Sequence, residues 1–351
     1  MRRDQNAGLA HGLNSCPCAP KVSFKLSPKN QKLSDGISNL APSLLKQEAE
    51  AMEQAETVLL LDETRMRLNI STSEIGGFVT SFIRRNKANQ ATTRPKLHSP
   101  LKHPHGPFHF QFALTPGCPF EVQSSLDLIN WITVSSGVFS GEMMDYVDSS
   151  ASDFSARFYR VRSGELSSEN ILGFAAVSIP PGFSMIANPF DSVSNTVSSL
   201  MAKMPDGTTL SKFDPSQHKL SSNTYRNDRW KNPHEKLSPG EGGILFNPSN
   251  DYLTLNFSGK VQQGNLFNPI PAGFSIRSSL VPRPGRLNLD LQFPLSEGDT
   301  IQIFDRDRQE YVTYKYPSPV WEKNPPVIGI CEAFWVQKTS PENWSRTLWI
   351  E

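Results

Sequence analysis

The sequence has almost no net charge, few cysteines and no long apolar run. Its 351 residues include 35 Lys plus Arg against 34 Asp plus Glu, so no strong field would draw the chain to nucleic acid or to an anionic membrane. The four cysteines are too scattered to define a disulfide framework. No stretch reaches the roughly 18 apolar residues of a membrane helix, and the start of the chain, charged and then polar, shows no secretory signal. We therefore expect no transmembrane segment and no nucleic-acid partner.

Turn-forming residues are abundant instead. The chain has 28 prolines and 22 glycines, and 10% of its residues are aromatic. This composition is typical of short strands joined by tight turns rather than of helical bundles. We predict a mainly β protein with room for two or three domains.

Residues 1–105 are rich in Ser, Asn, Lys, Gln and Pro. Within them, apolar residues recur at helical spacing over residues 43–61, which predicts one amphipathic helix. Because an isolated helix of this length is barely stable, we expect a disordered tail with one helix; the alternative is a helix that docks on a partner. The proline-punctuated stretch up to Pro107 is interpreted as a linker.

Alternating residues mark the start of an ordered region. Phenylalanines and a leucine alternate with other residues over 108–114, and a turn is expected at 115–118. Residues at 120, 122 and 124 alternate with their neighbours in the same way. Together with a further strand at residues 157–162, this pattern predicts a small β-sandwich over residues 106–165.

Two stretches of this region carry a resemblance. Residues 120–131 (FEVQSSLDLINW) and 157–160 (RFYR) resemble a short module of secreted and cell-surface proteins of environmental bacteria. The resemblance implies a non-catalytic accessory domain and an extracellular or cell-surface location. Trp131 and Tyr159 fall at motif positions that are better explained as core than as binding residues.

A motif near the middle of the chain returns further along. IPPGFS at residues 179–184 is followed by IPAGFS at residues 270–275, an offset of 270 − 179 = 91 residues. The same offset aligns residues 207–214 with residues 298–305 without a gap. Identities that cluster at one offset indicate a duplication. We predict a tandem, pseudo-twofold pair of homologous β-rich units.

The first unit is predicted over residues 172–262 and the second over residues 263–351. The recurring residues are assigned structural roles; they are Gly182, Phe183, Phe213, Asp214, Trp230 and Glu241 in the first unit and Gly273, Phe274, Phe304, Asp305, Trp321 and Glu332 in the second. Each glycine is expected to give the backbone freedom at a turn, and the phenylalanine after it to anchor the core. The two tryptophans are expected at matching buried positions.

Two further stretches complete the description of the units. Residues 197–204 have helical spacing, but residues 287–293 at the matching place alternate, so a strand is predicted for both. Residues 239–246 (PGEGGILF) resemble a repeat that follows the short module in the same kind of bacterial protein. That resemblance implies an uncharacterised, non-enzymatic region.

The repeated acids, Asp214 with Asp305 and Glu241 with Glu332, are the first candidates for chemistry. A glycosidase needs two carboxylates about 5–10 Å apart, and the sequence does not place these together. An Asp that closes a strand before Pro215 usually caps a turn, and acids that recur in both units are better explained by the fold than by catalysis. Residues 305–308 could ligate calcium, but their arginines favour a self-neutralised surface loop.

A possible metal site is formed by His103, His105 and His109, with Cys118 not far along. Without a fixed fourth ligand, such histidines are more often exposed loop residues. Residues 16–18 (CPC) are an equally weak metal signal, so we expect no metal and no cofactor.

Two tryptophans have no counterpart in the first unit. Trp335 and Trp344 are therefore expected to be exposed, where they could stack on a sugar. The sequence favours a non-catalytic surface, interaction or scaffold protein with an unknown protein or glycan ligand. The alternative is a carbohydrate-binding or carbohydrate-active protein: a coplanar aromatic strip would favour binding, and two facing carboxylates in a cleft would favour catalysis.

Overall fold

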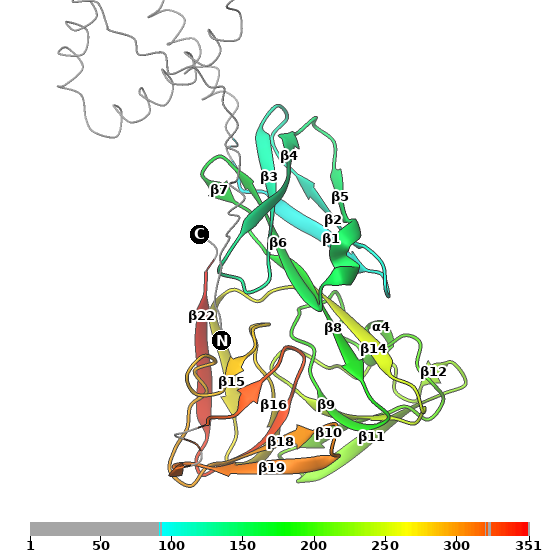
Figure 1. The fold of residues 1–351 in the computed structure, drawn as a ribbon, viewed down its shortest axis with the longest axis vertical. Helices are drawn as coiled ribbons and strands as arrows, with labels where there is room; N and C mark the ends of the chain where they lie inside the picture. Colours follow the sequence, from blue (N-terminus) through cyan, green and yellow to red (C-terminus); the bar gives the residue numbers. More distant parts are fainter. Residues whose placement is uncertain (1–90, 92, 320, 322–323, 350–351) are drawn as a thin grey trace, which may run out of the picture. The chain divides into compact units, whose positions relative to one another are not determined.

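A computed structural model of the chain describes residues 91, 93–319, 321 and 324–349. These residues belong to one unit, Ala88–Glu351, and they are mainly β, as predicted. The helix and tail predicted before residue 91 lie outside the described residues. Figure 1 shows the order of the elements.

The first part of the unit is a sandwich of two antiparallel sheets. The smaller sheet has the order β1 (Lys96–Lys102), β2 (Phe108–Ala113) and β5 (Met144–Asp148), and a 3-10 turn, Ser149–Asp153, follows β5. The larger sheet has the order β14 (Leu253–Lys260), β8 (Leu172–Ile179), β6 (Ala156–Ser163), β3 (Pro119–Ser125) and β4 (Ile132–Val138), with β7 (Leu166–Ser167) beside β6.

Aromatic side chains fill the space between these two sheets. Strand alternation points Phe108, Phe110 and Phe112 of β2 inward, and all three are buried. The larger sheet meets them with Tyr159 and Phe174, and the Phe108 and Tyr159 rings stack with centroids 5.0 Å apart. The sandwich therefore has a core of its own.

The predicted boundaries of this sandwich are wrong at both ends. It begins with β1 at residue 96, inside the stretch interpreted as a linker, because Pro100 and a bulge between His98 and Leu101 break the alternation of that strand. It also extends past residue 165, because β8 and β14 of the first predicted unit complete its larger sheet.

The first segment, residues 172–262, contributes a second sheet. Its order is β12 (Arg229–Trp230), β11 (Lys219–Arg226), β10 (Thr209–Asp214), β13 (Gly243–Asn247) and β9 (Gly182–Ile186), and a single helical turn, α4 (Val197–Leu200), precedes β10. In the second segment, residues 263–351, the matching sheet has the order β16 (Gly273–Arg277), β21 (Phe334–Lys338), β18 (Thr300–Asp305) and β19 (Glu310–Lys315). Two strand pairs accompany it: β15 (Gly264–Ile270) with β22 (Glu342–Leu348), and β17 (Gly285–Arg286) with β20 (Val327–Ile328).

The two segments share strand order and pairing. The bounds of β9, β10 and β13 fall on those of β16, β18 and β21 after a shift of 91 residues (273 − 182, 300 − 209 and 334 − 243). The pair of β8 with β14 is matched by the pair of β15 with β22. Descent of both segments from one duplicated unit stays a prediction.

The contact between the segments is reciprocal. Ile186 bridges Glu332, and Glu241 bridges Arg277; the offset of 91 turns the first pair into the second (186 + 91 = 277 and 332 − 91 = 241). A contact in which each side uses the same positions is what a twofold relation requires. We call this junction the seam.

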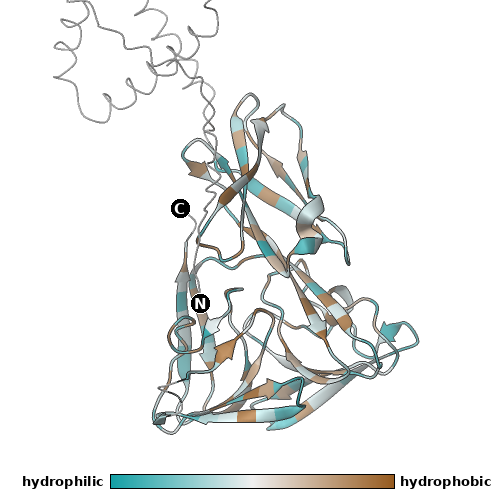
Figure 2. Ribbon diagram, in the orientation of Figure 1, coloured by the Kyte–Doolittle hydropathy of each residue, from teal (hydrophilic) through white to brown (hydrophobic). Residues whose placement is uncertain are grey.

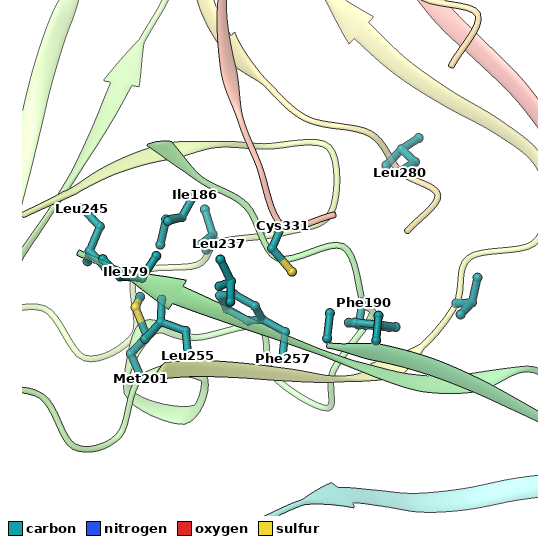
Figure 3. Packing of buried hydrophobic residues seen from close by; sticks show 14 of the residues in the cluster. Ile179, Ile186, Phe190, Met201, Leu237, Leu245, Leu255, Phe257, Leu280 and Cys331 are labelled. Carbon is teal, nitrogen blue, oxygen red and sulfur yellow. The ribbon is translucent and has the colours of Figure 1, made fainter. Parts of the chain in front are cut away.

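The first segment has a large apolar core (Figure 3). Leu280 and Cys331 of the second segment belong to the same buried cluster as residues of the first, and Figure 3 shows Cys331 near Leu237, so the two segments pack against each other. Trp230 and Trp321 are both buried, at 3% and 2% exposure. Hydrophobic and hydrophilic residues alternate along several of the strands around these cores (Figure 2).

The predicted strand between β9 and β10 is absent from the described residues of both segments. In the first segment, the helical turn α4 occupies this place, so the helical spacing of Val197 and Leu200 indicated the structure correctly and the predicted strand is wrong. In the second, Leu287 and Leu291 are buried four residues apart in an irregular turn while Leu289 is exposed. Alternating leucines here reflect a turn that covers the core of the second segment, not a strand.

Candidate functional site

The outward sides of β9, β13, β10 and of β16, β21, β18, β19 carry half-buried or exposed rings. These rings form a surface that we call the aromatic face; its members are Phe183, Phe213, Phe246, Phe274, Phe304, Tyr311 and Trp335. Met185, Ala187, Ile276 and Ala333 form a small buried cluster beneath it, and this cluster contains residues of both segments. The aromatic face therefore spans the seam on a shared support.

Exposure on this face is high for rings of this size. Phe183 is 49% exposed, Phe274 40% and Tyr311 42%, and the neighbouring Leu220 is 44% exposed. An exposed cluster of large apolar side chains often marks a surface that contacts a partner.

The rings touch one another at steep angles. Trp335 meets Phe213 across the seam at a centroid distance of 4.9 Å and an angle of 70°, and it meets Phe274 at 6.3 Å and 87°. The indole nitrogen of Trp335 donates to the Tyr311 hydroxyl at 3.3 Å. These rings of the aromatic face thus meet edge-to-face and are not coplanar, unlike the flat platform on which a sugar ring stacks.

Phe183 and Phe274 are not the core anchors that the sequence predicted. Gly182 and Gly273 do have a positive φ, of 90° and 81°, as the turn prediction requires. One residue later, strand alternation turns each phenylalanine outward and buries the following serine instead. The apolar residue lies on the face away from the core, a choice that alternation alone does not reveal.

The prediction for Trp344 is also wrong. It is buried, at 1% exposure, its ring packs against Phe293 at 4.9 Å, and its indole nitrogen donates to the Leu291 carbonyl at 2.8 Å. Its strand partner Asn268 corresponds to Val177, which pairs with Leu255 in the first segment. Trp344 therefore fills an inward, leucine-like position, and a buried ring cannot stack on a sugar. Trp335, by contrast, is partly exposed.

A cleft opens at the seam beside the aromatic face. Its volume is about 430 Å³, and its lining consists of Lys212, Phe213, Asp214, Pro215, Ser221, Glu235, Glu241, Gly242, Ile276 and Arg277. We call it the seam cleft. Both segments line it, so neither segment alone would form it.

Glu241 closes a turn at one wall of this cleft. One of its carboxylate oxygens, Oε2, accepts the backbone N–H of Ser238 at 3.0 Å and the Lys212 ammonium at 2.9 Å. In the second segment, Glu332 accepts the backbone N–H of Gly329 at 2.8 Å in the same way. Both repeated glutamates therefore cap turns.

Arg277 lies beside Glu241, its bridge partner across the seam. Its Nη1 donates to the Ile276 carbonyl at 3.2 Å, and its Nε is buried without an acceptor among the described residues. Burial lowers the pKa of Arg277, while the Glu241 carboxylate acts in the opposite direction. The guanidinium is thus partly desolvated and incompletely bonded within the chain.

The repeated aspartates also have local partners. Asp214 accepts the Ser216 hydroxyl at 2.7 Å and the backbone N–H groups of Ser216 and Gln217 at 2.8 and 3.3 Å, and these bonds, the hydroxyl one most, lower its pKa. Asp305 accepts the backbone N–H of residues 307 and 308, each at 3.0 Å, and Arg308 lies 3.8 Å from it. Both acids shape hairpin turns, and the 305–308 loop carries its own counter-charge.

The histidines whose spacing could hold a metal do not gather with further ligands among the described residues. His103 and His109 meet edge-to-face with centroids 5.1 Å apart, and Cys118 is a buried free cysteine. Among the described residues, no group of three or more His, Cys, Asp or Glu side chains could hold a metal ion. Residues 16–18 lie outside the described residues.

Among the described residues, no helix has the length and apolar character needed to cross a bilayer.

Three charged residues of the cleft were not predicted from the sequence. Lys212, Glu235 and Arg277 stand opposite Ile303, Pro326 and Ile186 when the segments are aligned at the offset of 91. A charged residue in one segment and an apolar or proline residue in the other is the signal that could have singled them out.

Comparison of the chain with protein-family models and with curated proteins gave no match.

Proposed function

We propose that this chain is a non-catalytic interaction protein whose aromatic face binds the surface of a folded protein partner. The observation that carries the proposal is the half-exposed set of rings that spans both segments and is fixed from below by a shared buried cluster. Such a surface is apolar, rigid and already formed, so little side-chain entropy is lost on binding.

The residue types support a protein partner. Aromatic residues are enriched at the centre of protein interfaces, and a few of them carry most of the binding free energy. On the outward side of the same strands, hydroxyl and amide groups pair across the sheet, with Ser211 and Ser222 2.8 Å apart and Gln302 and Thr313 3.4 Å apart. A polar surround of this kind is typical of an interface rim.

A catalytic role has less support. The recurring acids are engaged in turns and ion pairs, as described above for Asp214, Asp305, Glu241 and Glu332. Hydrogen bonds lower the pKa of Asp214, the opposite of the change expected of a general acid in a glycosidase. We therefore propose that the chain acts by binding and not by catalysis.

Site-specific photo-crosslinking tests the proposal. A photoreactive amino acid at Phe274 of the full chain, expressed in its host cell, should give a discrete crosslinked protein that is lost when Trp335→Ala is added. The control position is Tyr252, which is 65% exposed and lies outside the aromatic face. The same products from both positions, or products insensitive to the tryptophan change, would refute it.

A glycan ligand is the second candidate. It is favoured by one observation, the partly exposed Trp335 indole beside the polar side chain of Gln302, which pairs with it across the strands. A glycan array probed with the full chain and with Trp335→Ala separates the two candidates. Binding lost in the variant would favour carbohydrate, and a blank array would leave the protein partner in front.

A further inference from the structure

The seam has two equivalent positions, and a chain residue fills one of them. There the Arg306 side chain reaches across the seam: its Nη2 pairs with Oε1 of Glu332, and its Nη1 donates to the Ser178 carbonyl at 3.2 Å. The other oxygen of Glu332 holds the turn. This position shows how a guanidinium pairs with the capping glutamate, whose turn recurs in the other segment.

The other position lacks this guanidinium. Pro215 stands at the place of Arg306 when the segments are aligned at the offset of 91 (306 − 91 = 215). Oε2 of Glu241 holds the turn and accepts the Lys212 ammonium, but no described residue donates to Oε1. Among the described residues, Oε1 of Glu241 therefore has no hydrogen-bond donor; the Glu241 side chain is 42% exposed, and Arg277, its bridge partner, attracts the carboxylate electrostatically.

Pro215 leaves this position open. It stands where the second segment has Arg306, and the seam cleft of about 430 Å³, which Pro215 lines, remains on this side. Gly242 beside it is closely packed, because a Cβ there would overlap the Cβ of Ala333.

The charge of the lining selects the occupant. Lys212 and Arg277 are basic, whereas Asp214, Glu235 and Glu241 are acidic, so the lining has one negative charge in excess (2 − 3 = −1). A single cation makes the cleft neutral, and a carboxylate would double the excess. The Phe213 ring, which also lines the cleft, offers the face on which a planar guanidinium stacks well.

We propose that the seam cleft is the binding site for an arginine side chain of the partner, which pairs with Glu241 as Arg306 pairs with Glu332. The inference rests on the proposed function, because it names a residue of the same partner. Charge-assisted hydrogen bonds to a fixed carboxylate would give the docked surface its register and orientation.

The test uses N-acetyl-arginine amide as the probe and the full-length chain labelled for NMR. Saturable shifts of the amide signals of Ser221, Glu235 and Arg277 are expected at roughly millimolar probe, an affinity usual for one side chain. Glu241→Gln should weaken the affinity about tenfold or more, whereas Glu332→Gln, which alters the equivalent turn cap, should leave it unchanged. N-acetyl-citrulline amide should not bind.

A second variant keeps the test independent of the cap. Pro215→Arg supplies the missing counterpart of Arg306, so it should fill the cleft, raise the melting temperature and abolish the probe-induced shifts. No saturable shifts in the unaltered chain, or equal affinity in the two glutamate variants, would overturn the inference. Because the probe assay involves no partner, such a failure leaves the crosslinking result at Phe274 standing.

Discussion

Lys338 and Asp299 form an ion pair with no exposed side-chain surface, and breaking it should destabilise the fold strongly. Both side chains are 0% exposed. The ammonium also donates to Oε2 of Glu342 at 2.7 Å and to the Pro294 carbonyl at 3.1 Å, so all three of its donors are used. Lys338→Met removes the charge and leaves the Asp299 carboxylate buried with only neutral donors.

The magnitude follows from burial. Removing one partner of a buried ion pair costs about 3–5 kcal/mol of the free energy of unfolding. Arg286 and Asp290 provide the control, because their pair is 2.8 Å long but 51% and 42% exposed. Arg286→Met should cost far less than Lys338→Met, because water screens an exposed pair.

Urea unfolding of Lys338→Met, Asp299→Asn and the double variant gives the coupling free energy directly. The double variant should cost clearly less than the sum of the single variants, since neither charge is then left alone. Additive losses within about 0.5 kcal/mol would refute the buried-pair reasoning.

The pH dependence provides a second check on the same pair. Burial would raise the pKa of Asp299, but the hydrogen bonds from Lys338 and from the backbone N–H of Ser296 and Thr339 outweigh it and hold the pKa below its usual range. The contribution of this carboxylate is therefore complete above the unfolded pKa of about 3.9 and is lost as the pH falls through the lower folded value. The stability difference between the unaltered chain and Lys338→Met should shrink below about pH 4.

Three further outcomes are expected. Trp344→Ala should cost about 3–5 kcal/mol in urea unfolding, because it empties a buried site, whereas Trp335→Ala should cost roughly half as much or less; equal losses would contradict their different burial. Hydrogen bonds from neighbouring groups outweigh burial and lower the pKa of Asp127 to about 2, so an NMR titration should find it ionised at pH 3, and a midpoint near 4 would contradict this. Gly182→Ala should destabilise the fold more than Gly273→Ala, although both glycines have a similar positive φ. The new Cβ would lie 2.6 Å from Oε1 of Gln309 at position 182, but 3.9 Å from Cε1 of His218 at position 273. Equal melting temperatures of the two variants would argue against the Gln309 contact.

Much of the β framework follows from local patterns. The alternation of residues 108–113 predicts β2, and the offset of 91 residues predicts that β9, β10 and β13 have equivalents in β16, β18 and β21. Burial of Trp230 and Trp321 at matching places also follows from it. Local alternation and self-similarity are sufficient for these elements because neighbouring residues fix them.

Orientation and register were less predictable. Alternation divides a strand into two faces but does not say which face meets a core, and Phe183 lies on the outer one. In β1 a bulge and Pro100 hid the strand itself. In both places the outcome depends on strands that pair from elsewhere in the chain.

The seam cleft could not be predicted from either segment alone. Lys212 and Arg277 are 65 residues apart (277 − 212 = 65) and come together only because the segments make a reciprocal contact. Their charge differs from that of their counterparts Ile303 and Ile186, so the sequence holds the signal. The meaning of that signal requires the fold.

Hydrogen exchange of the full chain, alone and with the protein captured at Phe274, tests the central claim most directly. Binding on the aromatic face predicts slower exchange in β9, β16 and the β18–β19 hairpin, with β4 of the sandwich unchanged. Protection confined to β4 and the sandwich, with none in the sheets of the two segments, would contradict the claim that the aromatic face is the binding surface.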